Sequence, residues 1–500
     1  MIDCFFCRKK RYPVKTTPHQ HPPSLGIFFA TEMWERYGFY VVQTLLALYL
    51  ALHFKWPDKQ VYALVGSFTA LTYISPVVGG WIADHLIGQK RSTLLGALFL
   101  FMSYLLLSFN ASGCTLTLSL AGIAVGTGLL KSNISSLLGN EYPINSPSRE
   151  SGFTIFYMGI TTGIILGTTL PSTLNAHFGW SMPFTSAALG ILIALTVFSW
   201  GIHRYAIHDY HPYQYNLKKS IQAALMIVAM WSMAYLVLNC PALANGAFIT
   251  TVVLSLTYLL YAAYAEPPQQ ARQTLAIALL CIISVMFWAF YFQMFLSLTL
   301  FIVRVVKPTL AGMPFPPPYY VGMQSIGMIV IGCFLARKKS HTNASQQGIR
   351  SGNKFVLSMG MMTLAYGCIA LAAHQDLNSS NLLLPITIIP AYLLISLAEL
   401  LLSPVGLCAV TLLASRKKVS TMMGIFFVSL GIGGFLSGKL AGLTSTPLGE
   451  PDLLILKAHY AASFTYLLEI LCIAFIVSAG LNYAIRRLMT DHKSSLTGSK

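Results

Sequence analysis

Charge is scarce in this chain of 500 residues. Only 9% of the residues are Asp, Glu, Lys or Arg, whereas 55% are hydrophobic and the mean hydropathy is +0.65. A soluble protein carries about 25% charged residues, so this scarcity excludes a soluble protein. The alternating polar and apolar pattern of a membrane β-barrel is also absent. Because a spanning helix needs ~20 apolar residues, the sequence predicts an all-α integral membrane protein in a lipid bilayer, with about fourteen spans.

The cysteines exclude little and indicate little. Nine of them are scattered along the chain, mostly inside apolar stretches. Cys4 and Cys7 have CxxC spacing, but a single pair supplies only half of a zinc site. No group of His, Asp and Glu has the spacing of metal ligands, and no glycine-rich phosphate-binding loop is present. We therefore expect no metal, no cofactor and no enzymatic activity.

The formal charge of +17 does not indicate a nucleic-acid-binding protein, because the basic residues lie in clusters beside apolar segments. Counted from the N-terminus, the clusters fall on one side of the membrane: Arg8-Lys9-Lys10-Arg11, Lys90-Arg91, Arg204 with Lys218-Lys219, Arg337-Lys338-Lys339, Arg416-Lys417-Lys418 and Arg486-Arg487. By the positive-inside rule, both termini are expected in the cytoplasm. Arg304 and Lys307 are the main exceptions. No cleavable leader precedes the proline-rich stretch 13–23, so we expect no signal peptide.

The apolar segments follow a pattern of six, two and six. They lie near 34–54, 60–83, 92–110, 116–137, 150–174, 181–202, 220–238, 244–264, 273–303, 319–336, 354–373, 384–414, 419–444 and 458–485. This predicts a cytoplasmic tail at 1–24, a six-helix bundle at 25–203, a linker with an inserted hairpin at 204–268, a second six-helix bundle at 269–486 and a tail at 487–500. The hairpin carries no intramembrane charge and is expected at the periphery, facing lipid.

Three ions begin the first apolar segment. Glu32, Glu35 and Arg36 share a helical stripe or its flank with Tyr40, at steps of three and four residues. Ions at membrane depth are costly and usually mark a path for substrate or protons. We therefore expect this face of the helix to line a cavity.

Two more ions lie inside apolar segments of opposite halves of the chain. Lys131 lies in the fourth span, and Glu399 lies in the tenth core span beside a Ser-Pro break. With Arg36, the first half is basic to mixed and the second acidic, which fits a zwitterion such as a dipeptide of ~7 Å or a tripeptide of ~10 Å. Alternatively, Glu399 is a neutral buried carboxyl bonded to a neighbouring helix, and we expect this of Glu469.

The loop after the second span resembles a clasp. Gly80, Asp84, Gly88, Lys90 and Arg91 combine an acid at a helix end, a glycine turn and a basic pair. Asp84 is expected to pair with a base or a helix N-terminus of a neighbouring span, holding one end of a bundle shut.

These motifs resemble those of the proton-dependent oligopeptide transporter family, a branch of the major facilitator superfamily. The stretches that carry the resemblance are Glu32-x-x-Glu35-Arg36, Gly126-Thr-Gly-Leu-Leu-Lys131, Phe153-Thr-Ile-Phe-Tyr157-Met-Gly159, Phe287-Trp-Ala289, Glu399-Leu-x-Leu-Ser-Pro404-x-Gly406, Met422-Met-Gly424 and the clasp loop. The resemblance implies the major facilitator fold and proton-coupled symport of di- and tripeptides by alternating access. The inserted hairpin is typical of bacterial members, which implies the bacterial inner membrane.

The resemblance also assigns roles to individual residues. It implies proton coupling by Glu32, Glu35 and Arg36; binding of the peptide carboxylate by Arg36 and Lys131; contact with the peptide backbone by Tyr40 and Tyr73; and binding of the amino end by Glu399. Phe292 and Phe426 would add an aromatic wall on the second half. Packing between helices is an equal alternative for these aromatic residues.

Departures from the family pattern indicate a changed coupling. The family usually pairs an arginine of the first span with a glutamate of the seventh core span, where this chain has Gln43 and Phe292. Loss of both avoids a buried unpaired charge. We expect apolar packing and a hydrogen bond between these two spans instead. Gly327 also stands where asparagine is usual.

The alternatives are a major-facilitator carrier of another solute, such as an amino acid, nitrate or a drug, or a peptide-binding sensor. Small peptides and protons are the expected partners, and we expect the protein to function as a monomer.

Overall fold

The computed structural model describes residues 21–109, 112–143, 148–205, 207–209, 216–335, 344–375, 377, 380–415, 418–446 and 452–490. Several predictions from the sequence lie outside these residues. They concern most of both tails, the CxxC pair, and the basic residues at 8–11, 337–339 and 416–417.

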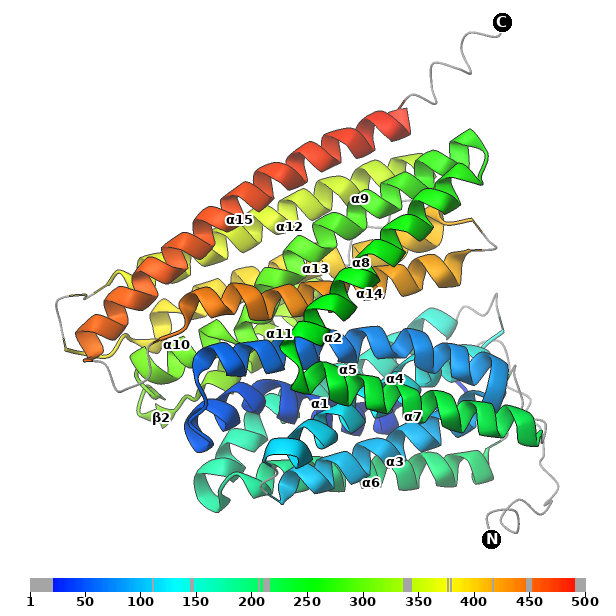
Figure 1. Cartoon of the computed structure of the whole chain (residues 1–500), viewed down its shortest axis with the longest axis horizontal. Coiled ribbons are helices and arrows are strands. Elements are labelled where there is room, and N and C mark those ends of the chain that lie inside the picture. The colour runs from blue at the N-terminus through cyan, green and yellow to red at the C-terminus, as the bar shows by residue number, and fades with distance from the viewer. Residues whose placement is uncertain are drawn as a thin grey trace, which may run out of the picture. The chain divides into compact units, whose positions relative to one another are not determined.

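The described chain is built almost entirely of helices (Figure 1). They are α1 (Leu25–Leu48), α2 (Asp58–Ile82), α3 (Gln89–Ser108), α4 (Gly113–Asn140), α5 (Ser148–Phe178), α6 (Ser181–Arg204), α7 (Leu217–Asn239), α8 (Pro241–Tyr264), α9 (Pro268–Tyr291), α10 (Ser297–Val305), α11 (Pro317–Leu335), α12 (Ala344–Ala373), α13 (Ile389–Leu413), α14 (Val419–Ala441) and α15 (Leu453–Thr490). Strands β1 (Thr309–Leu310) and β2 (Met313–Pro314) form a short antiparallel pair. π-Helical turns lie at Tyr49–His53 and Ala83–Ile87, and 3₁₀ turns at Phe292–Phe295, Pro385–Thr387 and Gly442–Thr444.

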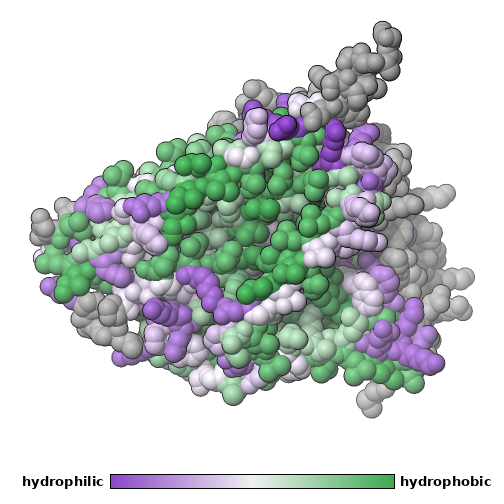
Figure 2. Space-filling view, turned by 45° about the horizontal axis from the view of Figure 1, so that its top comes forward, coloured by the Kyte–Doolittle hydropathy of each residue, from purple (hydrophilic) through white to green (hydrophobic). Residues whose placement is uncertain are grey.

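These helices match the composition, since a helix satisfies every backbone hydrogen bond inside lipid. Twelve of the described helical stretches are long and apolar enough to cross a membrane. α1 and α11, with 24 and 19 residues, are two further helices of spanning length. One face of the molecule shows a broad apolar area, with hydrophilic residues gathered toward its edges (Figure 2). The prediction of an all-α integral membrane protein is confirmed.

The chain divides into two compact units by contacts. The first comprises Met1–Val41, Ser75–Gly167 and His177–Ser232, and the second comprises Val42–Ile74, Thr168–Ala176 and Met233–Lys500. The C-terminal part of α1, the N-terminal part of α2 and a segment of α5 therefore belong to the second unit. The domain boundaries predicted at residues 203 and 268 divide the chain by the order of its spans, whereas these units group residues by contact. Those boundaries therefore stay a prediction.

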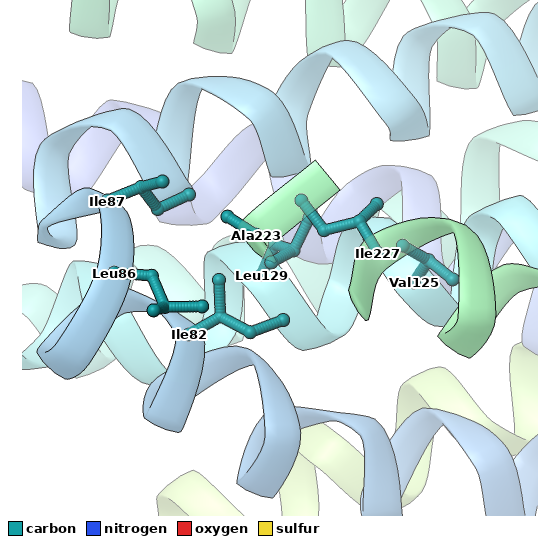
Figure 3. Close-up of a cluster of buried hydrophobic side chains, with 7 residues drawn as sticks. All are labelled: Ile82, Leu86, Ile87, Val125, Leu129, Ala223 and Ile227. Carbon is teal, nitrogen blue, oxygen red and sulfur yellow. The ribbon is translucent and has the colours of Figure 1, made fainter. Parts of the chain in front are cut away.

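In the first unit, α3 packs against α4 and α6. The inserted hairpin contributes here through α7, which lies against the end of α2 and against α4. The side chains of this cluster are Ile82, Leu86, Ile87, Val125, Leu129, Ala223 and Ile227 (Figure 3). Trp231 of α7 also donates from Nε1 to the carbonyl of Leu118, at 3.3 Å. One face of α7 is thus packed on protein.

In the second unit, α12 packs against α13 and α15, and α9 packs against α14. The predicted span at 273–303 is broken into α9 and α10 by the 3₁₀ turn at Phe292–Phe295. Side chains replace the lost helical hydrogen bonds: Gln293 Nε2 donates to the Ala289 carbonyl at 3.2 Å, and Thr299 Oγ1 donates to the Met294 carbonyl at 2.6 Å. Such polar side chains make a broken helix tolerable inside lipid.

Glu469 corrects one expectation. The sequence predicts a buried carboxyl bonded to a neighbouring helix, but this side chain is exposed on α15. No other residue of the described ranges hydrogen bonds to it. The face of α15 that carries Glu469 is turned away from the core of the second unit. The sequence alone does not show which face of this helix is buried.

Candidate functional site

The first-unit charges form one cluster on α1. The Arg36 guanidinium donates to Glu35 through both Nε and Nη2, the latter to Oε1 at 2.5 Å. Its Nε also lies 3.4 Å from Glu32 Oε1, one helical turn away. All three residues are at least 96% buried. Glu32 Oε2 is a buried atom without a hydrogen-bond partner in the described residues. The stripe predicted from sequence is thus a compact charged cluster.

Close packing of α5 on α1 positions this cluster. A Cβ atom on Gly163 of α5 would lie 2.2 Å from the Met33 carbonyl oxygen and 2.9 Å from Arg36 Cβ. One turn on, a Cβ atom on Gly167 would lie 2.7 Å from the Tyr37 carbonyl oxygen. Small residues allow helices in membranes to approach this closely. Any larger side chain at Gly163 would push α1, and with it Arg36, away from its present position.

Lys131 of α4 joins the same cluster electrostatically. Its ammonium interacts with Arg36, Glu35 and Glu32. The cluster therefore holds two cations and two carboxylates in one unit. Tyr40, one turn beyond Arg36, is partly exposed, and its ring contacts Phe39 edge-on at 5.5 Å. The structure thus brings together four of the five residues predicted here, with Tyr40 beside them.

Glu399 has a defined environment in the second unit. Its Oε2 accepts hydrogen bonds from Tyr291 OH at 2.9 Å and from Gln324 Nε2 at 2.7 Å. Oε1 accepts none from the described residues, and it is not among the buried atoms that lack a partner. The Glu399 side chain is partly exposed. One carboxylate oxygen is therefore held by protein while the other stays accessible.

The aromatic residues predicted around the site are buried. Phe292 is 1% exposed, and its ring lies 5.4 Å from both Tyr73 and Trp288. Phe426 is 2% exposed and covers Gly406, where a Cβ atom would lie 2.4 Å from its ring. In this structure Phe292 and Phe426 pack between helices, as the alternative interpretation has it. Their contact with substrate stays a prediction.

The expected hydrogen bond between the first and seventh core spans is wrong in its partner. Gln43 Nε2 of α1 donates to Thr69 Oγ1 of α2 at 3.1 Å, and Gln43 Oε1 has no partner in the described residues. The Gln43 amide bonds to the second span because Thr69 lies within hydrogen-bonding distance of it. Phe292 packs on the ring of Tyr73, which also lies on α2, at 5.4 Å. Apolar packing between the first and seventh core spans stays a prediction.

Arg304, an exception to the positive-inside pattern, forms an ion pair with Asp58 at the beginning of α2. Arg304 Nη1 and Nη2 donate to the two oxygens of Asp58 at 2.7 and 2.8 Å. Nη1 also donates to Tyr460 at 3.0 Å and Thr446 at 3.1 Å. Asp58 accepts further bonds from the Thr446 backbone N–H at 3.1 Å and hydroxyl at 3.0 Å. The pair joins α2, α10, α15 and the loop after α14.

The clasp loop is only partly as expected. Gly88 has φ 79° and ψ 158°, so glycine permits the tight turn between the π-helical end of α2 and α3. Asp84, however, is exposed, and no described residue forms an ion pair or hydrogen bond with it. The predicted pairing of Asp84 is therefore not observed, because the π-helical turn directs it outward. Gly80 lies beside Ser132, and the Lys90 backbone N–H donates to Asp209 at 3.2 Å; Arg91 is exposed.

Sequence reasoning missed several polar residues that the structure brings into these sites. Gln324 and the hydroxyl of Tyr291 contact Glu399, and Asp58, Thr446 and Tyr460 surround Arg304. An amide inside the apolar run 319–336 was the available signal for Gln324. For Arg304, the signal was its position, together with Lys307, on the side of the membrane opposite the basic clusters.

Comparison with known proteins shows a consistent relationship. The sequence model of the POT family matches residues 90–453. Dipeptide and tripeptide permease B of Edwardsiella piscicida is 29% identical over 476 residues, covering 94% of this chain and 96% of the permease. Dipeptide and tripeptide permease A of Escherichia coli K12 is 28% identical over 465 residues, covering 91% of each chain. The crystal structure of tetrameric PepTSo2 matches with a TM-score of 0.80 at 26% identity, covering 93% of this chain and 99% of that one.

Proposed function

This chain belongs to the POT family, and from this premise we propose that it is a symporter that carries di- and tripeptides into the cell with protons. The match also accords with the expected major facilitator fold and with a transporter rather than an enzyme. The relatives named above are dipeptide and tripeptide permeases by name.

The arrangement of charge carries this proposal. One unit holds Arg36 and Lys131 in a mixed cluster, and the other holds Glu399 with an accessible oxygen. A dipeptide at neutral pH has a carboxylate and an ammonium ~7 Å apart when extended. We assign the carboxylate to Arg36, which binds it through a planar fork, and to Lys131, which acts as a point charge. Glu399 would bind the ammonium, with Tyr40 and Tyr73 along the peptide backbone.

Proton coupling would use the same cluster. Arg36 is bound to Glu35 and lies close to Glu32, so its guanidinium is engaged within the protein. Protonation of these glutamates would release Arg36 for the peptide carboxylate, which links proton entry to substrate binding. Phe292 leaves the seventh core span without a carboxylate at its break, so in this chain the coupling would rest on Glu32 and Glu35.

The second unit supports alternating access, in which the bundles rock around a central site. Asp58 and Gln43 come from the first six helices of the sequence, yet both lie in the second unit. Close contacts continue along this side, since a Cβ atom on Gly66 would lie 2.8 Å from Gly438 Cα. If the basic clusters face the cytoplasm, this end of α2 faces outward. We therefore assign the Asp58–Arg304 pair and the Gly66–Gly438 contact to the outer gate.

The driving force is sufficient for accumulation. A proton moving down ~100 mV releases ~2.3 kcal/mol, and each unit of pH gradient adds ~1.4 kcal/mol. Moved one for one with a neutral peptide, this supports accumulation of roughly a few hundred-fold. All assigned residues lie in one chain, so we propose that a monomer transports. The bacterial inner membrane, with both termini in the cytoplasm, would be its location.

Uptake into proteoliposomes tests this function. The purified protein should accumulate labelled Ala-Ala when the outside is acidic and the inside is negative, and a protonophore should abolish the accumulation. Glu399→Gln should reduce uptake strongly. Glu469→Gln, the same change at an exposed acid that has no hydrogen bond or ion pair with the described residues, is the matched control and should transport as the wild type does. Uptake that is flat from acid to alkaline external pH would remove proton coupling from the account.

A second candidate is a carrier of another zwitterionic or anionic solute. The observations that favour it are the departures at Gln43, Phe292 and Gly327. Two of them border the Glu399 site: Gly327 lies against Ser396 of the helix that carries Glu399, and Phe292 follows Tyr291, which donates to Glu399. Competition separates the two candidates. Free amino acids or nitrate would displace labelled Ala-Ala only weakly from a peptide transporter, and strongly from the alternative carrier.

A further inference from the structure

The environment of Glu399 contains a glutamine that the proposed function does not yet use. Gln324 is 2% exposed and lies on α11, whereas Glu399 lies on α13. Its Nε2 donates to Glu399 Oε2 at 2.7 Å. We propose that Gln324 is a positioning residue, which orients the Glu399 carboxylate so that Oε1 faces the ammonium end of the substrate. This inference rests on the proposed function, because it concerns how Glu399 recognises an ammonium group.

Close contact between α11 and α13 fixes the amide in place. A Cβ atom on Gly327 would lie 2.7 Å from Ser396 Oγ, so the two helices meet at van der Waals distance. Ser396 Oγ in turn donates to the Gln324 carbonyl at 2.7 Å. Gln324 is thus bound to α13 through both its backbone and its side chain. Because Ser396 and Glu399 are three residues apart, they share one face of α13.

The asymmetry of the hydrogen bonds gives the carboxylate its direction. Tyr291 and Gln324 both donate to Oε2, at 2.9 and 2.7 Å. Oε1 receives no donor from the described residues. Two donors on one oxygen restrict rotation of the carboxylate, so Oε1 presents its lone pairs to one accessible direction. Hydrogen bonds to an ionised carboxylate are also stronger than those between neutral groups.

The same geometry explains why glycine stands at position 327. An asparagine there would need space that Ser396 already occupies. The close approach of the helices instead lets the longer side chain of Gln324, one turn away, reach Glu399. The side-chain amide of Gln324 therefore lies beside Glu399, where it contacts the Glu399 carboxylate and not the solvent.

The test compares ligands with and without an ammonium group. Ala-Ala and N-acetyl-Ala-Ala differ at the amino end, so only the first engages Glu399. Gln324→Leu should raise the KM for Ala-Ala uptake about tenfold, the effect expected from one charge-assisted hydrogen bond. The inhibition constant of N-acetyl-Ala-Ala against Ala-Ala uptake, calculated with the KM of each variant, should stay within twofold of the wild-type value. Tyr291→Phe, which removes only a hydroxyl, should shift the KM in the same direction and guards against misfolding of the leucine variant.

Gln270→Leu is the matched control. Gln270 Nε2 also donates a hydrogen bond to α13, to the carbonyl of Leu413 at 2.8 Å. Leu413 lies ~21 Å along the helix from Glu399. This variant should not change the ratio of the two ligands. If both ligands weaken equally in Gln324→Leu and Tyr291→Phe, or if neither variant shifts the KM, the positioning role is wrong. A wild-type protein that takes up no dipeptide at all refutes the proposed function instead, and so the two failures are distinct.

Discussion

The ion pair of Asp58 and Arg304 yields the most quantitative prediction. Asp58→Asn removes the charge and replaces one acceptor oxygen by an NH₂ group. That group would face donors of Arg304 or Thr446, because Asp58 accepts four hydrogen bonds from these two residues. If the pair belongs to the outer gate, as proposed, the substitution should destabilise the closed gate.

The magnitude follows from the burial of the two partners. Removing one partner of a buried ion pair costs ~3–5 kcal/mol. The Asp58 side chain is 4% exposed but that of Arg304 is 23% exposed, so water would recover part of the guanidinium's solvation. We take ~2 kcal/mol as the net effect, and this corresponds to a shift of about 30-fold in the population of closed and open gates.

Distance measurements between spin labels provide the assay. Labels at Lys59 and Lys307, both exposed, would follow the outer ends of α2 and α10 in a variant without the nine native cysteines. Asp58→Asn should add a population at longer distance. Asp452→Asn is the matched control, because Asp452 is an exposed acid ahead of α15 that forms no ion pair with the described residues. Unchanged distances in Asp58→Asn, or an equal change in Asp452→Asn, would refute this role of the pair.

Three further predictions concern the charged cluster and the seventh core span. Glu32→Gln and Glu35→Gln should each flatten the pH dependence of uptake but preserve exchange of peptide for peptide, which needs no net proton movement; loss of exchange would contradict a role limited to coupling. Lys131→Ala should raise the KM for Ala-Ala about tenfold but not the inhibition constant of Ala-Ala amide, which lacks a carboxylate. Phe292→Glu should lower uptake, because it buries a carboxylate with no cationic partner; a strong rise in proton-driven uptake would show that the single change restores coupling.

The fold was largely predictable because long apolar runs and scarce charge leave few alternatives in a membrane. The ends of helices were harder. The first span was expected near 34–54, yet α1 begins at Leu25. Hydropathy counts Glu32, Glu35 and Arg36 as costs of burial, whereas in the structure they offset one another by pairing. The break after α9 was also invisible, since neither glycine nor proline marks it.

The site was predictable where charge marked it, and not where tertiary contact decided it. Arg36, Lys131 and Glu399 are ions inside apolar segments, which is itself a functional signal. Gln324 carries no charge, and its contact with Glu399 depends on how closely α11 approaches α13 at Gly327. Asp58 and Arg304 are 246 residues apart. No local pattern joins two such ions, and only the packing of the second unit shows that they meet.

The most direct test is a crystal structure of the protein with Ala-Ala bound. The account predicts a single dipeptide with its carboxylate at Arg36 and Lys131 and its ammonium at Oε1 of Glu399. A dipeptide bound in the reverse direction, or one that touches neither Lys131 nor Glu399, would contradict it.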